Sequence, residues 1–355
     1  MSATRPLRVA VVGCGDVSVV HLDAVTSSPV ARLVAVGDTD PGRARAASER
    51  HGVPAFADHR DLLEQVRPDV VHISTPHDQH AQVAVDCLVA GVHVVLEKPL
   101  AHTLAEGTRI VEAARANPRT KIAVCFQNRY NAPVRAARDL IASGDVGDVL
   151  GSSALVAWHR TPAYYAARPW RGTWSASGGG VLMNQAIHTL DLVRWLVGDV
   201  VGVRGLASRM GLQGGAPHGV PMDVEDTAQL VLDHAGGARS VFFATVTGPT
   251  DAPVSLEIVT ERAVLQLRGD LVVTHADGRV DAVPEQEPGA VGRSYWGASH
   301  RLLIEDFHRR VDDPEPFWIG PADGLESLRI IQEVYTQGDG NFRQPVAAAT
   351  ARMGD

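Results

Sequence analysis

The N-terminal part of the chain alternates short, continuous apolar runs with amphipathic segments. Between residues 7 and 141 the runs are LRVAVVG, RLVAVGD, DVVHIST, VHVVLEK and KIAVCFQ. Strands that are buried on both faces read as such runs, and helix-length connections between them favour a parallel, doubly wound sheet. One connection, residues 78–90, has the spacing of a helix face at Ala81, Ala84, Val85 and Leu88. We predict a Rossmann-type α/β domain over residues 1–145.

The C-terminal part has a different pattern, in which apolar and polar residues alternate with period two. VEDTAQLVLDH, ARSVFFATVTG and APVSLEIVTE show it, with Gly, Pro and Asp turns between them. This alternation is typical of an antiparallel sheet with one buried face. Helices are expected around residues 299–311 and 322–335, and a long loop is expected over 276–297. We predict an α+β domain over residues 146–355.

Length and composition restrict the class of protein. A chain of 355 residues is longer than one hydrophobic core usually supports, so two domains with a cleft between them are expected. Hydrophobic residues make up 45% and charged residues 21%, which excludes a disordered or collagen-like chain. The net charge is −8 and no stripe of Lys or Arg is present, so we expect small-molecule partners and no nucleic acid.

The cysteines and the apolar stretches indicate the cellular compartment of the protein. Cys14, Cys87 and Cys125 are odd in number, have no CxxC spacing and lie in apolar segments, which fits a reducing compartment. The apolar run at the N-terminus is too short for a secretory signal. No apolar stretch reaches the roughly 20 residues that cross a bilayer. We therefore predict a cytoplasmic protein with no membrane partner.

A glycine loop follows the first predicted strand and precedes a helix in VAVVGCGDVSVVHLDAV. Gly13 allows a tight turn, and Gly15 lets the backbone approach a pyrophosphate at the helix N-terminus. Ser18 replaces the third glycine of the dinucleotide fingerprint, a mild departure because that position serves close packing of helix on strand. We assign the loop to a dinucleotide cofactor through Gly13, Gly15, Asp16 and Val17.

The second predicted strand ends at Asp38, about 20 residues beyond the glycines, where a carboxylate can accept hydrogen bonds from an adenosine ribose. An Asp at this place repels a ribose 2′-phosphate, and Thr39 supplies no cation for it. NAD is therefore predicted rather than NADP. The alternative interpretation of Asp38 is a solvated carboxylate at the strand end.

Three further segments carry a family resemblance: VVHISTPHDQHAQVAVDCLVAGVHVVLEKPL, PWRGTWSASGGGVLMNQAIHTLDLVRWLVGD and SHRLLIEDFHRRV. Together they closely resemble the glucose-fructose oxidoreductase and inositol dehydrogenase family, Gfo/Idh/MocA. The resemblance implies a Rossmann domain followed by a domain with a large, mostly antiparallel sheet. It also implies that the exposed face of this sheet forms a homodimer or homotetramer.

The resemblance also assigns residues around the nicotinamide. The Glu-Lys-Pro motif of the family, here Glu97, Lys98 and Pro99, places the lysine in the active site. The position of Lys98 supports this assignment, because it stands at the carboxyl end of a predicted central strand, where open α/β sheets bind ligands. The alternative interpretation of Lys98 is a surface lysine at a strand end. The Thr-Pro-x-x-x-His stretch borders the cofactor in the family, which assigns Thr75, Pro76 and His80, with a structural role for His80 left open. His77 and His80 lack further ligands at metal spacing, so no metal is predicted.

The segment 178–197 places Asn184, His188 and Asp191 on one helix face. In many family members an Asp stands at the position of Asn184 and forms the catalytic set with the histidine and the lysine. Because Asn takes up no proton near neutral pH, we assign Asn184 to hydrogen-bonding a substrate hydroxyl. His188 is assigned as the base and Lys98 as the ammonium that polarises the oxygen, although the two roles are exchangeable. Asp191 either orients the imidazole or meets Arg194 on the helix surface.

Other polar groups precede this helix: His159, Arg160, Tyr164, Tyr165, Arg168, Trp170 and Arg171. Guanidinium groups grip carboxylates or phosphates, and aromatic rings stack on the apolar faces of sugars. We assign Arg160 and Tyr165 to the substrate and Trp170 and Arg171 to packing. The remaining histidines are interpreted as scattered and uninformative.

These residues predict an NAD-dependent dehydrogenase or reductase that transfers a hydride to or from a carbinol carbon of a sugar, cyclitol or sugar derivative. Two alternatives are open. Some similar proteins use bound NAD for a transient oxidation during glycoside cleavage. Others are non-catalytic regulators, which a damaged catalytic set would indicate, whereas Lys98 and His188 are both present.

Overall fold

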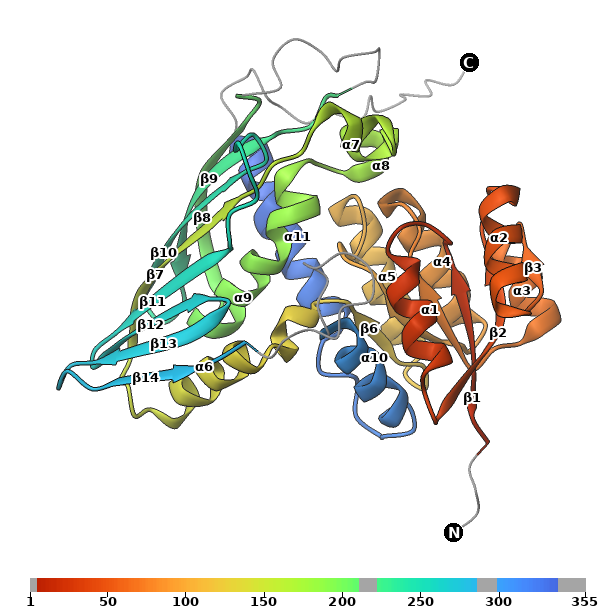
Figure 1. Ribbon diagram of the computed structural model, residues 1–355, viewed down its shortest axis with the longest axis horizontal. Coiled ribbons are helices and arrows are strands. Elements are labelled where there is room, and N and C mark those ends of the chain that lie inside the picture. Colours follow the sequence, from red (N-terminus) through yellow and green to blue (C-terminus); the bar gives the residue numbers. More distant parts are fainter. Residues whose placement is uncertain (1–4, 211–221, 286–298, 338–355) are drawn as a thin grey trace, which may run out of the picture.

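The computed structural model describes residues 5–210, 222–285 and 299–337, which form two sheets with helices on and between them (Figure 1). The N-terminal sheet has six parallel strands in the order β3-β2-β1-β4-β5-β6. This is the doubly wound Rossmann order, with its reversal beside β1, where such sheets bind ligands. The strands are β1 (Leu7–Val12), β2 (Ala31–Gly37), β3 (Ala55–Phe56), β4 (Val70–Ile73), β5 (His93–Leu96) and β6 (Ile122–Val124).

Each predicted apolar run of this half forms a strand, and the short β3 is an addition that the sequence did not indicate. The helices are α1 (Ser18–Thr26), α2 (Pro41–His51), α3 (His59–Val66), α4 (His77–Val89) and α5 (Leu104–Ala116). Local chemistry sets their ends, as α2 illustrates. The Asp40 side chain accepts hydrogen bonds from the first-turn N–H groups, Pro41 opens the helix, and Gly52 closes it in a left-handed conformation.

The second sheet has eight strands in the order β14-β13-β12-β11-β7-β10-β9-β8, and only β7 and β10 pair in parallel. The predicted mostly antiparallel sheet is therefore confirmed. Its strands are β7 (Val149–Ala157), β8 (Val200–Ser208), β9 (Thr227–His234), β10 (Arg239–Thr245), β11 (Ser255–Thr260), β12 (Ala263–Arg268), β13 (Asp270–His275) and β14 (Val280–Val283). β14 corrects the expected loop over 276–297, because it extends the sheet by pairing with β13; residues 286–297 lie outside the described part.

Helices fill the space between the two sheets. Figure 1 shows α9 (Ile187–Val197) and α11 (Pro321–Gln337) between them, while α10 (Ser299–Arg309) lies against α1. The other helical elements are α6 (Ala132–Ser143), α7 (Pro162–Ala166), α8 (Trp174–Ser177), the 3₁₀ turns η1 (Gln127–Tyr130) and η2 (Pro169–Gly172), and the π-helical η3 (Leu182–Ala186).

α11 packs against both α5 and β8, so the end of the chain joins the two halves. We propose to keep the domain boundary near residue 145, in the turn between α6 and β7. None of the described helices is long and apolar enough to cross a membrane.

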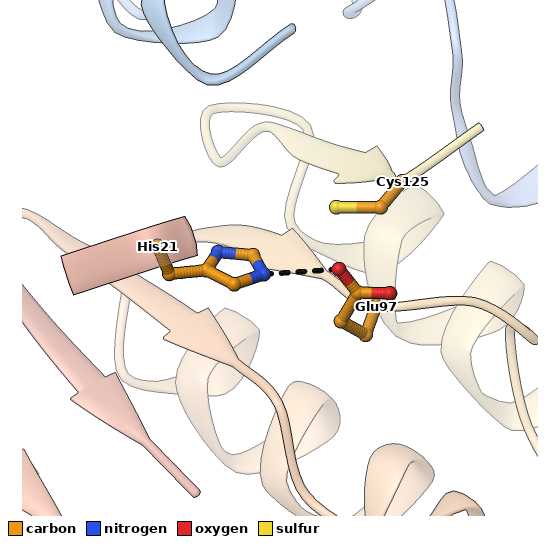
Figure 2. A group of neighbouring side chains, drawn as sticks. All are labelled: His21, Glu97 and Cys125. Carbon is orange, nitrogen blue, oxygen red and sulfur yellow. Dashed lines mark hydrogen bonds and ion pairs between the residues drawn. The ribbon is translucent and has the colours of Figure 1, made fainter. Parts of the chain in front are cut away.

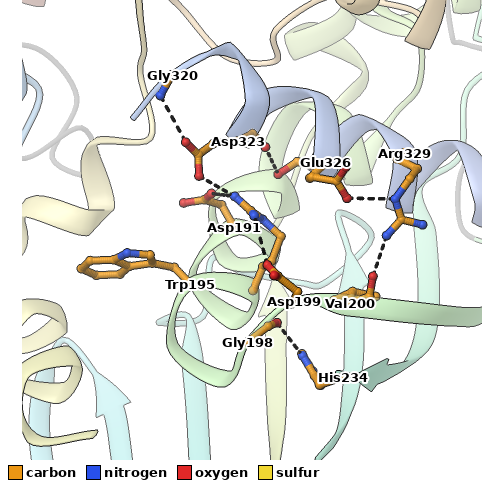
Figure 3. A network of polar contacts seen from close by, with 12 residues as sticks. Asp191, Trp195, Gly198, Asp199, Val200, His234, Gly320, Asp323, Glu326 and Arg329 are labelled. Atoms are coloured by element: carbon orange, nitrogen blue, oxygen red, sulfur yellow. Dashed lines mark hydrogen bonds and ion pairs between the residues drawn. The ribbon is translucent and has the colours of Figure 1, made fainter. Parts of the chain in front are cut away.

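A buried ion network holds α9, α11 and η1 together. Arg129 is 2% exposed and donates to both carboxylate oxygens of Asp191, at 2.8 and 2.5 Å, and to Asp323 at 2.9 Å. Arg194 donates to the same Asp323 oxygen at 2.6 Å. Figure 3 shows Asp191 and Asp323 close together at the N-terminal end of α11, where the Gly320 N–H donates to Asp323. Charges buried to this degree need partners, and here each one has them.

Replacing Asp191 by Ala is expected to lower the free energy of unfolding by about 3–5 kcal/mol, because it leaves Arg129 buried beside a single shared carboxylate. Urea unfolding followed by circular dichroism measures the change. The matched control is Asp199→Ala, since this exposed carboxylate lies 3.9 Å from Arg194 in the same region and its loss is expected to cost under about 0.5 kcal/mol. Equal effects of the two substitutions would contradict a stabilising role for the buried network.

Candidate active site

A cavity of about 540 Å³ lies between the two halves of the chain. Both halves line it, which agrees with the expected interdomain cleft. Among its walls are Gly13, Gly15, Asp16, Val17, Asp38, Thr75, Pro76, His80, Glu97 and Lys98 from the N-terminal half, and Arg160, Tyr164, Asn184 and His188 from the C-terminal half.

The glycine loop has the shape that a phosphate group requires. Gly13 has φ +92°, and a Cβ there would lie 2.5 Å from the Ser74 carbonyl carbon, so a side chain is excluded on both counts. A Cβ at Gly15 would meet nothing within 4 Å, so the loop backbone borders open space. The Ser18 hydroxyl donates to the Gly15 carbonyl at 2.6 Å, which closes the turn in place of the third glycine. The residues present fit a dinucleotide.

Asp38, at the end of β2, is held in place by several donors. It accepts hydrogen bonds from the N–H groups of Cys14 and Asp40, both at 2.8 Å. The Arg43 guanidinium donates one hydrogen bond to each carboxylate oxygen, at 3.0 and 2.9 Å. Burial favours a raised pKa for Asp38, but these hydrogen bonds, with that of Arg43 the largest, lower the pKa below its usual value. The expectation that this site has no cation was wrong, because the first turn of α2 brings Arg43 back to the strand end.

Asp16 connects the glycine loop to the C-terminal half. Its carboxylate accepts hydrogen bonds from Arg168 at 2.7 Å and from Arg171 at 3.1 Å. The Arg171 guanidinium also lies 4.4 Å from the centre of the Tyr164 ring and lines the cavity. The expectation that Arg171 serves packing alone was therefore incomplete.

Lys98 follows β5 and is half-buried in the cavity wall. Its ammonium donates to the backbone carbonyl oxygen of Asn184 at 2.7 Å, which ties the Rossmann half to the π-helical turn of the other half. Burial lowers the pKa of Lys98, and the charge of Glu97 partly opposes this. The following peptide, Lys98–Pro99, is cis. His80 lies between the carbonyls of Pro99 and Thr75, at 2.8 and 3.1 Å, so it has a structural role in positioning this loop.

Asn184 and His188 project into the cavity from a distorted helix start. Residues 182–186 form a π-helical turn, a feature frequent at functional sites. The buried Glu225 anchors this turn by accepting hydrogen bonds from the N–H groups of Gly180 and Leu182, at 2.6 and 2.9 Å. Burial raises the pKa of Glu225 to about 7. The Asn184 amide nitrogen donates to the Ser177 hydroxyl at 3.1 Å, which leaves its Oδ1 for a ligand.

The His188 imidazole is uncharged at neutral pH. Burial, followed by repulsion from Lys98, holds its pKa well below 6.5. Asp191 does not orient this ring, because it lies almost one helical turn further on and pairs with Arg129. The contact with Arg194, at 3.8 Å, is the alternative that the structure supports. Arg129 was missed because it lies 62 positions upstream of Asp191.

The structure brings only some of the expected substrate residues to the cavity. Arg160 lines it, donates to Asp251 at 2.9 Å and lies 4.9 Å from the centre of the Trp158 ring. Tyr165 is 2% exposed and is not part of the cavity wall, so the expectation that it faces the substrate was wrong. Its neighbour Tyr164 lines the cavity instead, because α7 turns the two adjacent rings in different directions.

Three polar atoms in the cavity region are buried without a hydrogen-bond partner in the described part of the chain: Thr75 Oγ1, Gln127 Oε1 and His188 Nδ1. Unpaired buried polar atoms are costly, so a concentration of them indicates positions that a ligand satisfies. Gln127 was not singled out from the sequence. Its only signal was its place after a predicted strand, at the edge where ligands bind.

Glu97 lies among histidines that are far apart in the sequence. The interpretation of these histidines as scattered and uninformative was therefore wrong. Glu97 Oε1 accepts hydrogen bonds from His21 Nε2 at 3.0 Å and from His300 Nε2 at 2.9 Å. Figure 2 shows His21, Glu97 and Cys125 grouped together, and residues of these types can bind metals. Burial and Glu97 hold the pKa of the Cys125 thiol well above 9, whereas a metal requires the thiolate. The absence of a metal therefore stays a prediction.

Comparison with known proteins gives the family. Residues 7–125 match the model of an oxidoreductase family with an NAD-binding Rossmann fold, and residues 134–266 match the Gfo/Idh/MocA C-terminal domain. The chain belongs to the Gfo/Idh/MocA oxidoreductase family. The resemblance seen in the sequence is confirmed, and so is an N-terminal domain of the NAD-binding type.

The relatives within the Gfo/Idh/MocA family match most of the chain. An inositol 2-dehydrogenase of Rubrobacter xylanophilus is 31% identical over 88% of this chain and 82% of its own. Inositol 2-dehydrogenase 2 of Saccharopolyspora erythraea is 28% identical over 86% of this chain and 81% of its own. The crystal structure of the WlbA dehydrogenase from Bordetella pertussis, in complex with NADH and UDP-GlcNAcA, superposes with a TM-score of 0.79 at 29% identity, covering 94% and 96% of the two chains.

Proposed function

We propose that this protein is an NAD-dependent dehydrogenase that transfers a hydride between the nicotinamide and a carbinol carbon of a cyclitol, sugar or sugar derivative. The observation that carries the proposal is the placement of Lys98, Asn184 and His188 around one cavity with the glycine loop. Curated relatives named inositol 2-dehydrogenase support a cyclitol or sugar as the substrate class. Gly13, Gly15 and Asp38 would hold NAD, which when bound supplies the hydride acceptor.

The side chains divide the remaining chemistry. His188 is neutral at pH 7, so it accepts the proton of the substrate hydroxyl. Lys98 donates one N–H to Asn184 and has two others with which to polarise the substrate oxygen. Asn184 Oδ1 accepts a hydrogen bond from a neighbouring hydroxyl, which fixes the orientation of the ring. Of these three residues, His188 contributes one of the unpaired buried atoms of the cavity region, its Nδ1.

Substrate selection is assigned to the wall formed by Trp158, Arg160 and Tyr164. The aromatic rings offer flat apolar faces to a sugar or cyclitol ring, and the guanidinium donates to its hydroxyls. Arg160 is partly neutralised by Asp251, which favours a neutral polyol over a strongly anionic substrate.

We propose a homodimer or homotetramer that assembles through the outer face of the eight-stranded sheet. The described helices lie on the inner face, as Figure 1 shows. Apolar side chains on neighbouring strands are exposed on the other face: Leu155 of β7 and Val241 and Phe243 of β10. Such a patch is typical of a contact surface. We also propose a cytoplasmic location, because Cys14, Cys87 and Cys125 are all free.

The test is absorbance at 340 nm for purified protein with NAD and a panel that includes inositol, other cyclitols, sugars and sugar acids. We expect NADH to form with at least one compound, and NADP to support a slower reaction. Denatured protein is assayed in parallel for released cofactor. NADH formation with none of the compounds, together with stoichiometric NAD released on denaturation, would contradict the proposal and favour transient oxidation during glycoside cleavage.

A further inference from the structure

A row of buried histidines runs from the cavity wall along the face of the Rossmann sheet that α1 and α10 cover. Glu97, which lines the cavity, accepts a hydrogen bond from His21 of α1 at 3.0 Å. His21 Nδ1 lies 3.1 Å from His72 Nδ1, in the middle of β4. His72 Nε2 lies 3.1 Å from Nε2 of His308, near the end of α10. All four side chains are buried, so the row is shielded from bulk solvent.

Hydrogen-bond counting with one proton on each ring gives the position of every proton in the row. Burial favours a raised pKa for Glu97, but His300 and His21 hold its pKa well below 4.5, so Glu97 is a carboxylate and His21 donates through Nε2–H. With one proton on His21, its Nδ1 is an acceptor, and His72 donates to it through Nδ1–H. His72 Nε2 in turn accepts from His308 Nε2–H. One proton on each neutral ring satisfies every contact in the row, and the N–H bonds all point toward Glu97.

One ring nitrogen of the row has no hydrogen-bond partner among the described residues in this assignment, and it belongs to His308, the residue farthest along the row from the cavity. His308 Nδ1 is a bare acceptor, buried without a partner in the part of the chain that the structure describes. Burial holds the pKa of His72 well below 6.5 and lowers that of His308 to about 4, so neither ring keeps an extra proton at pH 7. A row of neutral, hydrogen-bonded imidazoles passes protons without storing them.

We propose that His308, His72, His21 and Glu97 form a proton relay between the catalytic cavity and the α10 side of the Rossmann domain. A proton that binds His308 Nδ1 displaces the Nε2 proton of that ring to His72 Nε2. His72 then passes its Nδ1 proton to His21 Nδ1, and His21 passes its Nε2 proton to the Glu97 carboxylate. One proton enters, one arrives at the cavity, and no electrons move. The transfer leaves each ring in its other tautomer, and from that state His21 Nε2 accepts a proton from Glu97 and the reverse sequence carries a proton out.

The relay rests on the proposed function, because interconversion of an alcohol and a carbonyl with NAD takes up or releases one proton per turnover. The cavity, which the cofactor and substrate would occupy, lies between the two halves. Lys98 and His188 line the cavity together with Glu97, whose charge raises the pKa of both, so the three groups are electrostatically coupled. The relay gives their proton a path that bound ligands do not block.

The test variant is His72→Gln, because the Gln side chain can donate to His21 and accept from His308 but cannot pass a proton on. With NAD, inositol and little buffer, we expect kcat to fall about tenfold or more and to recover when imidazole is added as a diffusible proton carrier. His234→Gln, which replaces a buried histidine of the C-terminal sheet, is the matched control and should leave kcat and its buffer dependence unchanged. If His72→Gln does not fold, His308→Gln breaks the relay at its outer end.

A second measurement needs no turnover and so separates the relay from the proposed function. In protein labelled with ¹⁵N-histidine, nitrogen chemical shifts identify the proton-bearing atom of each neutral ring. We expect His72 to carry Nδ1–H and His308 to carry Nε2–H at pH 7. A charged His72 or the opposite tautomers would overturn the relay, as would wild-type kcat for His72→Gln in weak buffer. Absence of NADH with the expected tautomers would contradict the proposed function alone.

Discussion

Lys98→Met lowers kcat by roughly 10²–10⁴-fold and leaves the Kd for NAD within a few-fold of the wild-type value. The Met side chain keeps the apolar stem but removes the ammonium, which is the group placed to polarise the substrate oxygen. NAD binding persists because the glycine loop and Asp38 do not depend on this charge. Steady-state rates at 340 nm and quenching of tryptophan fluorescence by NAD measure the two quantities.

Lys121, the other lysine of the chain, provides the control for this prediction. It is buried and donates to the Glu315 carbonyl, away from the walls of the cavity. Lys121→Met therefore removes a buried ammonium without touching the site, and we expect kcat to stay within about twofold of wild type in the molecules that fold. A kcat for Lys98→Met above about a tenth of the wild-type value would contradict the proposal that the Lys98 ammonium polarises the substrate oxygen.

Asp38→Ser reverses or abolishes the preference for NAD, with the ratio of kcat/KM for NADP to that for NAD rising about 100-fold. The substitution removes the carboxylate that we propose as the hydrogen-bond acceptor for the ribose, an interaction worth about 1.5–3 kcal/mol, and also removes repulsion of a 2′-phosphate. In the wild-type protein Arg43 donates hydrogen bonds to both carboxylate oxygens of Asp38. In the variant its guanidinium is released and can bind a phosphate in the same bidentate way. Initial rates with each cofactor over a range of concentrations measure the ratio.

The double variant Asp38→Ser with Arg43→Met separates the two effects. It lacks the ribose acceptor and the freed guanidinium, so we expect poor use of NAD without the gain in NADP. If the double variant uses NADP as well as the single variant does, Arg43 is not the phosphate-binding group. An unchanged cofactor ratio in Asp38→Ser would show that Asp38 is a solvated strand-end carboxylate, the alternative that its sequence position left open.

Local features were readable from the sequence because their causes are local. Continuous apolar runs marked the parallel strands of the first half, and the alternation of Leu256, Glu257 and Ile258 marked a strand with one buried face, as β11 has. Gly13 and Gly15 identified the turn, since few residues tolerate its backbone. The family motifs then pointed to Lys98, Asn184 and His188, which all line the cavity.

Tertiary packing decided which buried groups meet. The partners Arg129 and Asp191 lie 62 positions apart, and His72 and His308 lie 236 positions apart, so no periodicity relates them. The choice of Tyr164 over Tyr165 depends on the angle at which α7 packs, and the placement of Arg43 against Asp38 depends on how α2 leaves its strand. Sequence by itself determined the two sheets and the glycine loop, because backbone preference and burial are properties of short segments, and the family motifs indicated the candidate catalytic side chains. Only the tertiary structure determined the ion network, the substrate wall and the histidine row, because these are set by the contact of surfaces that the chain order does not relate.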